Sequence, residues 1–157
     1  MIDVASQVGS DVPFCFDYFK KIINSSNKKF VRPRINLRFF LLLVYPNFKN
    51  LTRKIYQLNN FFSRPNLKLT DKYLKNNLIN ILQNDQNDLQ TIVESKNKKI
   101  KDLIYILSIQ NNCLFSRMSG SGSTCYGVFQ NLHSAKRAKK MLKKYYPNYW
   151  SVVSKTR

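Results

Sequence analysis

The chain has 157 residues, enough for one domain with a buried core of its own. Hydrophobic residues make up 43% of it and aromatic residues 13%, which excludes an intrinsically disordered chain. The net charge of +19 is compatible with a nucleic-acid or anionic-membrane partner. The basic residues are spread along the chain among many asparagines and isoleucines, however, so a solvated basic surface is the favoured interpretation.

The cysteines and the apolar runs argue against a disulfide-rich, a zinc-binding, a secreted and a membrane-spanning protein. Cys15, Cys113 and Cys125 are odd in number and show no C-x-x-C spacing, which predicts small buried residues and neither a disulfide framework nor a zinc site. A single histidine and few carboxylates also argue against a transition-metal site. The first residues have no signal-peptide pattern, and the apolar run 39–44 is too short to span a bilayer. We therefore expect a cytoplasmic protein without a membrane segment.

The first part of the chain contains one candidate catalytic carboxylate. Asp11 precedes a Val-Pro pair, and proline disfavours a helical conformation for the residue before it, so Asp11 is expected on a turn or at the entry of a strand. Two interpretations stay open: a turn or capping aspartate, or a carboxylate held in a cleft as a base. Residues 17–36 are polar and basic and predict a loop or a weak hairpin.

The middle of the chain begins with the most apolar segment. Residues 37–45 predict a central strand that is buried on both faces. A turn signal separates this strand from an expected helix over 51–62, whose apolar stripe consists of Leu51, Ile55, Leu58 and Phe62. Tyr56 lies on a flank of this stripe, so its ring faces either the core or a cleft.

The remaining elements define the fold class. Helical spacing recurs over 70–83, about 87–93 and 99–109. Strands are then expected over 112–116, 124–129 and 149–153, with a very basic helix over 134–145 before the last of them. This order predicts an α+β fold with a mostly antiparallel, four-stranded sheet and helices packed on one face.

A serine–glycine loop lies between two of the expected strands. Residues 118–129 read Met-Ser-Gly-Ser-Gly-Ser-Thr-Cys-Tyr-Gly-Val-Phe and hold three of the four glycines of the chain. Glycine permits a positive φ angle and close approach to the backbone, and consecutive backbone N–H groups can form an anion-binding nest. A tight hairpin turn explains the same residues equally well. The candidate anion-binding residues are Gly120, Ser121, Gly122 and Ser123.

Three segments together resemble the GHMP kinases. Residues 118–129 resemble the third motif of that family, Gly9-Ser-Asp-Val-Pro-Phe14 its Gly-x-Asp-Val-Pro segment, and Pro46-Asn-Phe48 through Tyr56 the segment after its central strand. Asn87-Asp-Leu89 stands where the same tripeptide occurs in the branch that phosphorylates 4-diphosphocytidyl-2-C-methyl-D-erythritol. The order and rough spacing agree with this branch over nearly the whole chain.

The resemblance implies a ferredoxin-like C-terminal domain over 37–157 and the end of the N-terminal kinase domain over 1–36. It implies transfer of the ATP γ-phosphoryl group, with Mg²⁺, to the 2-hydroxyl of 4-diphosphocytidyl-2-C-methyl-D-erythritol, in non-mevalonate isoprenoid biosynthesis. On this pattern Asp11 matches the catalytic base, Tyr56 an aromatic position that stacks on the cytosine ring, and Thr52 a residue of the same cleft. Gly120, Ser121, Gly122 and Ser123 match the loop that closes over the phosphates.

The sequence also departs from the family. It contains no Gly-Leu-Gly-Gly-Gly-Ser-Ser loop, which cradles the ATP phosphates in these kinases, and the Lys/Asn-rich residues 17–32 replace a glycine-containing region. Family members are nearly twice as long. We therefore expect either a kinase portion that works with a complementing N-terminal half or self-associates, or a folded but inactive remnant. A basic module that binds RNA or another anion is the alternative from a different class, based on the charge and the helix 134–145.

Overall fold

The computed structural model describes Val4, Gln7, Val12 and residues 22–24, 29–31, 38–63 and 71–156. Asp11 and Cys15 lie outside the described residues. The elements in chain order are β1 (Ile22–Asn24), β2 (Lys29–Val31), β3 (Phe40–Tyr45), α2 (Thr52–Gln57), α3 (Asp71–Asn84), α4 (Gln90–Lys96), α5 (Lys98–Ser108), β4 (Cys113–Met118), β5 (Cys125–Phe129), α6 (Leu132–Tyr145) and β6 (Trp150–Lys155).

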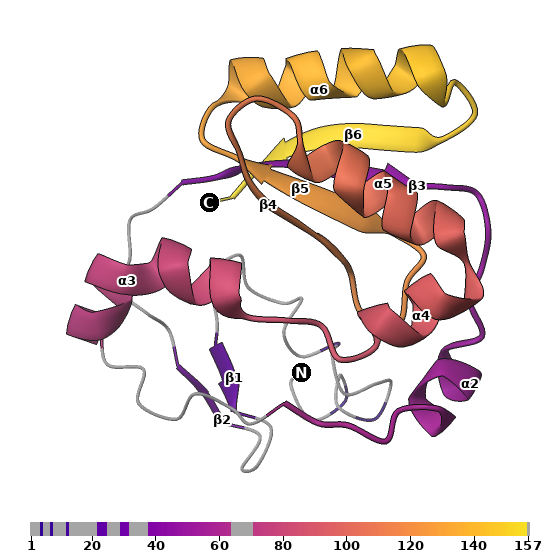
Figure 1. Cartoon of the computed structure of the whole chain (residues 1–157). Helices are drawn as coiled ribbons and strands as arrows, with labels where there is room; N and C mark the ends of the chain where they lie inside the picture. Colours follow the sequence, from indigo (N-terminus) through magenta and orange to yellow (C-terminus); the bar gives the residue numbers. More distant parts are fainter. Residues whose placement is uncertain are drawn as a thin grey trace.

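Four strands form one antiparallel sheet in the order β4-β5-β3-β6 (Figure 1). The central strand β3 pairs with β5, where Leu42 lies opposite Gly127, and with β6, where Leu42 lies opposite Val153. The edge strand β4 pairs with β5 across the serine–glycine loop. This confirms the predicted α+β fold. The short strands β1 and β2 form a separate antiparallel hairpin within the segment 17–36, where a loop or weak hairpin was expected.

Helices α5 and α6 cover one face of the sheet (Figure 1). Alternate residues of β3 point toward them, since Leu42 and Val44 are fully buried in the same cluster as the buried residues of both helices. That cluster includes Ile100, Leu103 and Leu107 from α5, Ala135, Ala138 and Leu142 from α6, and Phe129 from β5. Spacings of three and four residues place each helical set on one stripe. Each large side chain buried in this way contributes roughly 1.5–3 kcal/mol to folding.

Both sheet-covering helices begin at an asparagine that satisfies a free backbone donor. The Asn97 side chain accepts a hydrogen bond from Lys99 N at the start of α5, and the Asn131 side chain accepts one from Ser134 N at the start of α6. Such caps contribute about 1 kcal/mol each. They also fix the residues at which α5 and α6 begin.

Two burial expectations from the sequence are wrong. Leu41 and Leu43 are only half-buried, so β3 is not buried equally on both faces, because α5 and α6 cover one face alone. The helix expected over 51–62 ends at Gln57, and of its apolar stripe only Ile55 is buried, while Leu51, Leu58 and Phe62 are 46–73% exposed. A helix of six residues makes fewer than two turns, too short to present four stripe residues to the core.

Burial keeps the two described thiols protonated. Desolvation raises the pKa of Cys125 to about 12, with a further contribution from the nearby Glu94 carboxylate, and raises the pKa of Cys113 to about 11. Cys125 is buried, as the sequence predicted, whereas Cys113 is only half-buried. Within the described ranges no helix is long and apolar enough to cross a bilayer.

The substitution Leu103→Ala is expected to lower the free energy of unfolding by about 2–5 kcal/mol, because it leaves a cavity between α5 and the sheet. Chemical denaturation of the purified chain measures this difference. The matched control Lys101→Ala, on the exposed face of the same helix, is expected to change stability by less than about 0.5 kcal/mol. Equal effects of the two substitutions would contradict the assignment of the core.

The stability of the chain is expected to fall as the pH rises above 9. The Cys125 thiol ionises near pH 9.0 when unfolded but stays protonated to about pH 12 when folded, so the unfolded state binds fewer protons in this window and gains stability. Urea denaturation of wild type and Cys125→Ala is compared from about pH 8 to about pH 10.5, a range that brackets the pKa of an unfolded cysteine. The free energy of unfolding of the variant is expected to fall less than that of wild type over this range. An identical fall with pH in both proteins would contradict the prediction.

Candidate functional site

The serine–glycine loop connects β4 to β5 at the end of the sheet nearest α2 and α4 (Figure 1). Two backbone hydrogen bonds close the loop from within: Ser119 N donates to Thr124 O at 2.8 Å, and Gly122 N donates to Ser119 O at 2.9 Å. The loop is therefore a compact turn with a defined backbone path.

Two glycines are needed for this path for different reasons. Gly120 and Gly122 have φ angles of +53° and +81°, in the left-handed region that favours glycine. A Cβ atom on Gly122 would lie 2.6 Å from Met118 Sδ and 2.7 Å from Asn50 Nδ2, so the neighbouring side chains also exclude a larger residue. A Cβ atom on Gly120 would meet nothing within 4 Å, so this part of the loop borders open space.

Residues after β3 hold the loop on one side. Asn50 Nδ2 donates to Ser121 O at 2.9 Å, and Thr52 Oγ1 lies 3.0 Å from Ser121 Oγ. Ser123 Oγ donates to Phe48 O. The segment that enters α2 is thus attached to the tip of the loop by three hydrogen bonds.

The segment before α4 holds the loop on its other side. Asn87 Nδ2 donates to Met118 O at 2.9 Å and to Gly120 O at 2.8 Å, while its Oδ1 accepts from Leu89 N at 3.0 Å. These bonds use the carbonyl groups of the loop. The amides of Gly120 and Ser121 donate to no other group in the described part of the chain, which leaves them available to an anion.

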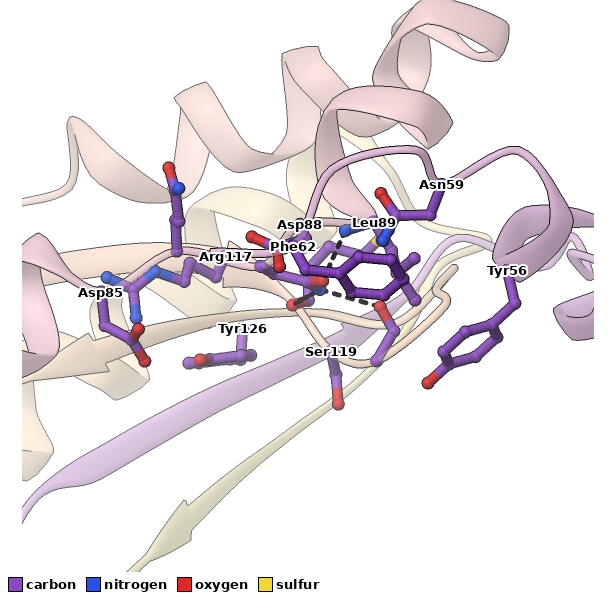
Figure 2. A pocket seen from close by; sticks show the side chains of 13 residues that line it. Tyr56, Asn59, Phe62, Asp85, Asp88, Leu89, Arg117, Ser119 and Tyr126 are labelled. Atoms are coloured by element: carbon purple, nitrogen blue, oxygen red, sulfur yellow. Dashed lines mark hydrogen bonds between the residues drawn. The ribbon is translucent and has the colours of Figure 1, made fainter. Parts of the chain in front are cut away.

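A hollow of about 430 Å³ lies beside the loop (Figure 2). Three aromatic side chains line it: Tyr56 from α2, Phe62 from the segment after α2, and Tyr126 from β5. Tyr56 and Phe62 are 57% and 73% exposed. Exposed rings at a concave surface suit a ligand with a flat apolar group.

Charged groups also line this hollow. Arg117, the last residue but one of β4, donates to Leu82 O, and its guanidinium lies 4.8 Å from the centre of the Phe115 ring. Asp88 Oδ2 accepts from Ser63 N and Ser63 Oγ, at 2.8 and 3.1 Å. Asp88 Oδ1 is buried without a hydrogen-bond partner. Within the described ranges, no group of three or more His, Cys, Asp or Glu residues is arranged to hold a metal ion.

The structure brings most of the predicted site residues together. Thr52 and Tyr56 lie one turn apart on α2, where Thr52 contacts the loop at Ser121 and Tyr56 lines the hollow that Gly120 also lines. Their binding roles, like those of Gly122 and Ser123, stay predictions. The position of Asp11 relative to them is outside the described residues.

The sequence analysis assigned no site role to the two asparagines that hold the loop, Asn50 and Asn87, or to Arg117 beside the hollow. Asn87 was singled out only as part of a tripeptide, and Asn50 and Arg117 were not singled out. For Arg117 a signal existed, because it stands two residues before the loop. For Asn50 no such signal existed. The exposed Asn47 lies in the same turn segment, and nothing in the sequence distinguishes Asn50 from it.

Replacing Asn87 by alanine is expected to loosen the loop, since the change removes two hydrogen bonds to loop carbonyls and one to Leu89 N. Hydrogen exchange of the Ser119 and Gly122 amides, which donate hydrogen bonds within the loop, is expected to become about tenfold faster or more. The matched control Asn84→Ala removes one exposed hydrogen bond within α3, to Asn80 O, and is expected to leave these amides unchanged. Unchanged exchange of these amides in both variants would contradict the role of Asn87 in holding the loop.

Comparisons with known proteins bear on this site. The family model described as GHMP kinases C terminal matches residues 63–148. The chain is 34% identical to the 4-diphosphocytidyl-2-C-methyl-D-erythritol kinase of Caldanaerobacter subterraneus subsp. tengcongensis, over 99% of this chain and 54% of that protein. It is 32% identical to the kinase of the same name from Pelagibacter ubique, over 98% of this chain and 53% of that protein. The chain thus spans about half the length of the curated relatives it matches.

Solved structures share the fold. A crystal structure of 4-(cytidine 5'-diphospho)-2C-methyl-D-erythritol kinase matches with a TM-score of 0.74 at 18% identity, over 97% of this chain and 56% of that one. A homoserine kinase from Cytophaga hutchinsonii matches with a TM-score of 0.56 at 15% identity, over 89% and 49%. With a family model that covers more than half of its residues and this shared fold, the chain belongs to the GHMP kinase family, to whose C-terminal domain the match corresponds.

Proposed function

We propose that this chain forms the C-terminal part of a kinase that transfers the γ-phosphoryl group of ATP to the 2-hydroxyl of 4-diphosphocytidyl-2-C-methyl-D-erythritol. The observation that carries the proposal is the attachment of Thr52 to the serine–glycine loop, next to a hollow that Tyr56 lines. A phosphate-binding loop and an aromatic wall are the two parts that a nucleotide-linked substrate needs. The curated relatives named above carry the name of this activity.

On the substrate side, the proposal assigns the cytosine ring to Tyr56. An exposed tyrosine ring offers a flat apolar face, and stacking of a base on an aromatic side chain contributes about 1–3 kcal/mol. Thr52 serves the cleft by holding Ser121, because its hydroxyl lies 3.0 Å from the serine hydroxyl. A displaced loop would therefore be the consequence of losing Thr52.

The phosphates of the substrate are assigned to the backbone amides of the serine–glycine loop. Gly120 N and Ser121 N are available donors, and hydrogen bonds from backbone amides to phosphate oxygens are charge-assisted. The net charge of +19 raises the local concentration of anionic substrates. Phosphoryl transfer depends mainly on positioning and charge neutralisation, which these groups supply.

The described residues offer backbone donors to a phosphate, and they contain no group of three or more His, Cys, Asp or Glu side chains arranged to hold a metal ion. Mg²⁺ accompanies ATP in kinase chemistry, where it neutralises the charge of the phosphates and is commonly held by one or two carboxylates together with the phosphates themselves. No residue in this part of the chain is assigned as its ligand.

The proposal divides the chain at residue 37, with 37–157 as the C-terminal domain and 1–36 as a contribution to the N-terminal kinase domain. The sequence match around Gly9–Phe14 supports this division. Asp11 would then act as the base that takes the proton from the 2-hydroxyl group. The partner of the chain is a small-molecule substrate, and the missing ATP-cradle motif calls for a complementing half.

Tyr56→Ala is expected to weaken binding of cytidine diphosphate about tenfold or more, because the stacking face is lost. Tyr56→Phe, which keeps the ring, is expected to bind within about twofold of wild type. Isothermal titration calorimetry with the 157-residue chain measures both. Tyr105→Ala, an equally exposed tyrosine on α5, is the control and is expected to have no effect. Equal binding by all four proteins would contradict the role of Tyr56.

Turnover tests the reaction itself. ADP release is measured with the 157-residue chain alone and after mixing with the separately expressed N-terminal portion of the Caldanaerobacter kinase. We expect little turnover by the chain alone, which has no Gly-Gly-Gly-Ser-Ser stretch, and substrate-dependent turnover in the mixture. Asp11→Asn in the mixture is expected to abolish it.

Turnover of the mixture that is unchanged by Asp11→Asn would show that Asp11 is not the base. Absence of turnover in the mixture, with Tyr56-dependent binding of cytidine diphosphate retained, would identify an inactive remnant that still binds. Turnover by the chain alone near the ordinary kinase range of about 1–100 s⁻¹ would show that no complementing half is needed.

A further inference from the structure

A groove runs between α5 and α6 on the side of these helices that faces away from the sheet. Two connected hollows of about 320 and 150 Å³ form it, and both are lined by Ile109, Gln110 and Met141. The larger hollow extends to Tyr145 and the smaller one to Arg137. The serine–glycine loop and the hollow at Tyr56 contribute no residue to the groove.

The floor of the groove is apolar and unusually exposed. Ile109, Met141 and Tyr145 are 59%, 41% and 65% exposed, although each is a large apolar side chain. Met141 and Tyr145 lie four residues apart and therefore on one face of α6. The one polar side chain that both hollows share, Gln110, is already engaged with Ile106 O. An exposed apolar strip of this kind marks an interaction surface.

The edge of the groove along α6 is basic. Arg137 lines the smaller hollow. At 100° per residue, Lys144 lies about 20° from Arg137 around the axis of α6, and both side chains are exposed. Helix α6 contains no acidic residue, and the last turn of α5, on the other side of the groove, contains no basic residue.

We propose that this groove docks an acidic amphipathic helix of a partner protein. Residues 134–145 of α6 span roughly 16 Å, about three turns of a docked helix, which is longer than a small ligand needs. Apolar side chains of the partner at three- and four-residue spacing enter the two hollows, and its Asp and Glu side chains meet Arg137 and Lys144. Charge complementarity sets the register and the choice of partner.

A second copy of this chain fits the groove less well, because it carries the same charge of +19 and has 8 acidic residues in all, so it repels the groove. Binding of the groove to a bilayer or to a nucleic acid is an outcome that the test below distinguishes from binding of an acidic helix.

The test uses the 157-residue chain and three fluorescein-labelled synthetic peptides of about 18 residues, five turns of helix. The first has Leu at helical spacing and Glu elsewhere, the second has Lys in place of every Glu, and the third has Ser in place of every Leu. Fluorescence anisotropy measures binding at low and high salt. We expect the Leu/Glu peptide alone to bind, more weakly at high salt because salt screens the charges.

Substitutions then test whether the peptide binds in the groove between α5 and α6. Arg137→Glu and Met141→Glu are expected to weaken binding of the Leu/Glu peptide about tenfold or more. Lys136→Glu changes the net charge as Arg137→Glu does, but Lys136 lines neither hollow, and this substitution is expected to change binding less than about twofold. Thermal melts confirm that the three variants fold as wild type does.

Three results would overturn the proposal. One is no binding of the Leu/Glu peptide. The second is an equal loss with Lys136→Glu and Arg137→Glu, which would show general attraction to a basic chain. The third is binding of oligouridylate or of phosphatidylserine vesicles that Met141→Glu abolishes while the peptide does not bind, which would assign the groove to a nucleic acid or a membrane instead.

Discussion

The pairing of β3 with β5 is the constraint on which the rest of the structure depends. Its antiparallel register puts Val44, near the end of β3, opposite Cys125, the first residue of β5, and Met118, the last residue of β4, is also paired with Cys125. The chain that leaves β3 must therefore pass beside the β4–β5 loop. This is why residues 48–52 reach the loop although they lie about seventy positions earlier in the sequence.

Side-chain amides turn this proximity into a defined site. Asn50 approaches the loop from the β3 side and Asn87 from the α4 side, and both donate to backbone carbonyls of the loop. Each such hydrogen bond contributes about 1 kcal/mol net, but a lost one leaves an unsatisfied carbonyl and costs more. The loop is thus held by its acceptors while its amides at Gly120 and Ser121 stay available as donors. A loop fixed in advance loses little entropy when it binds a phosphate.

The same sheet separates two surfaces of different chemistry. At the end of the strands, aromatic rings and loop amides surround a hollow that suits a nucleotide-linked ligand. Outside α5 and α6, an apolar groove is edged by lysine and arginine. The high net charge serves each surface differently, because small anions are attracted from a distance whereas a docked helix needs contact between paired charges.

The sequence alone determined the elements and the fold class of this protein, because hydrophobic periodicity reports directly on burial in long helices and strands. The apolar stripe of α5 and the strand at 40–45 are examples, and the glycine-rich loop was recognisable from the need for positive φ angles. Periodicity misled at α2, where Leu51, Leu58 and Phe62 follow a helical stripe but are exposed, since a helix of six residues presents only Ile55 to the core. Only the tertiary structure decided which asparagines hold the loop, and that Ile109, directly after α5, and Met141 of α6 line one groove. Such relations depend on strand register and helix placement, which bring together residues whose local sequences contain no record of each other.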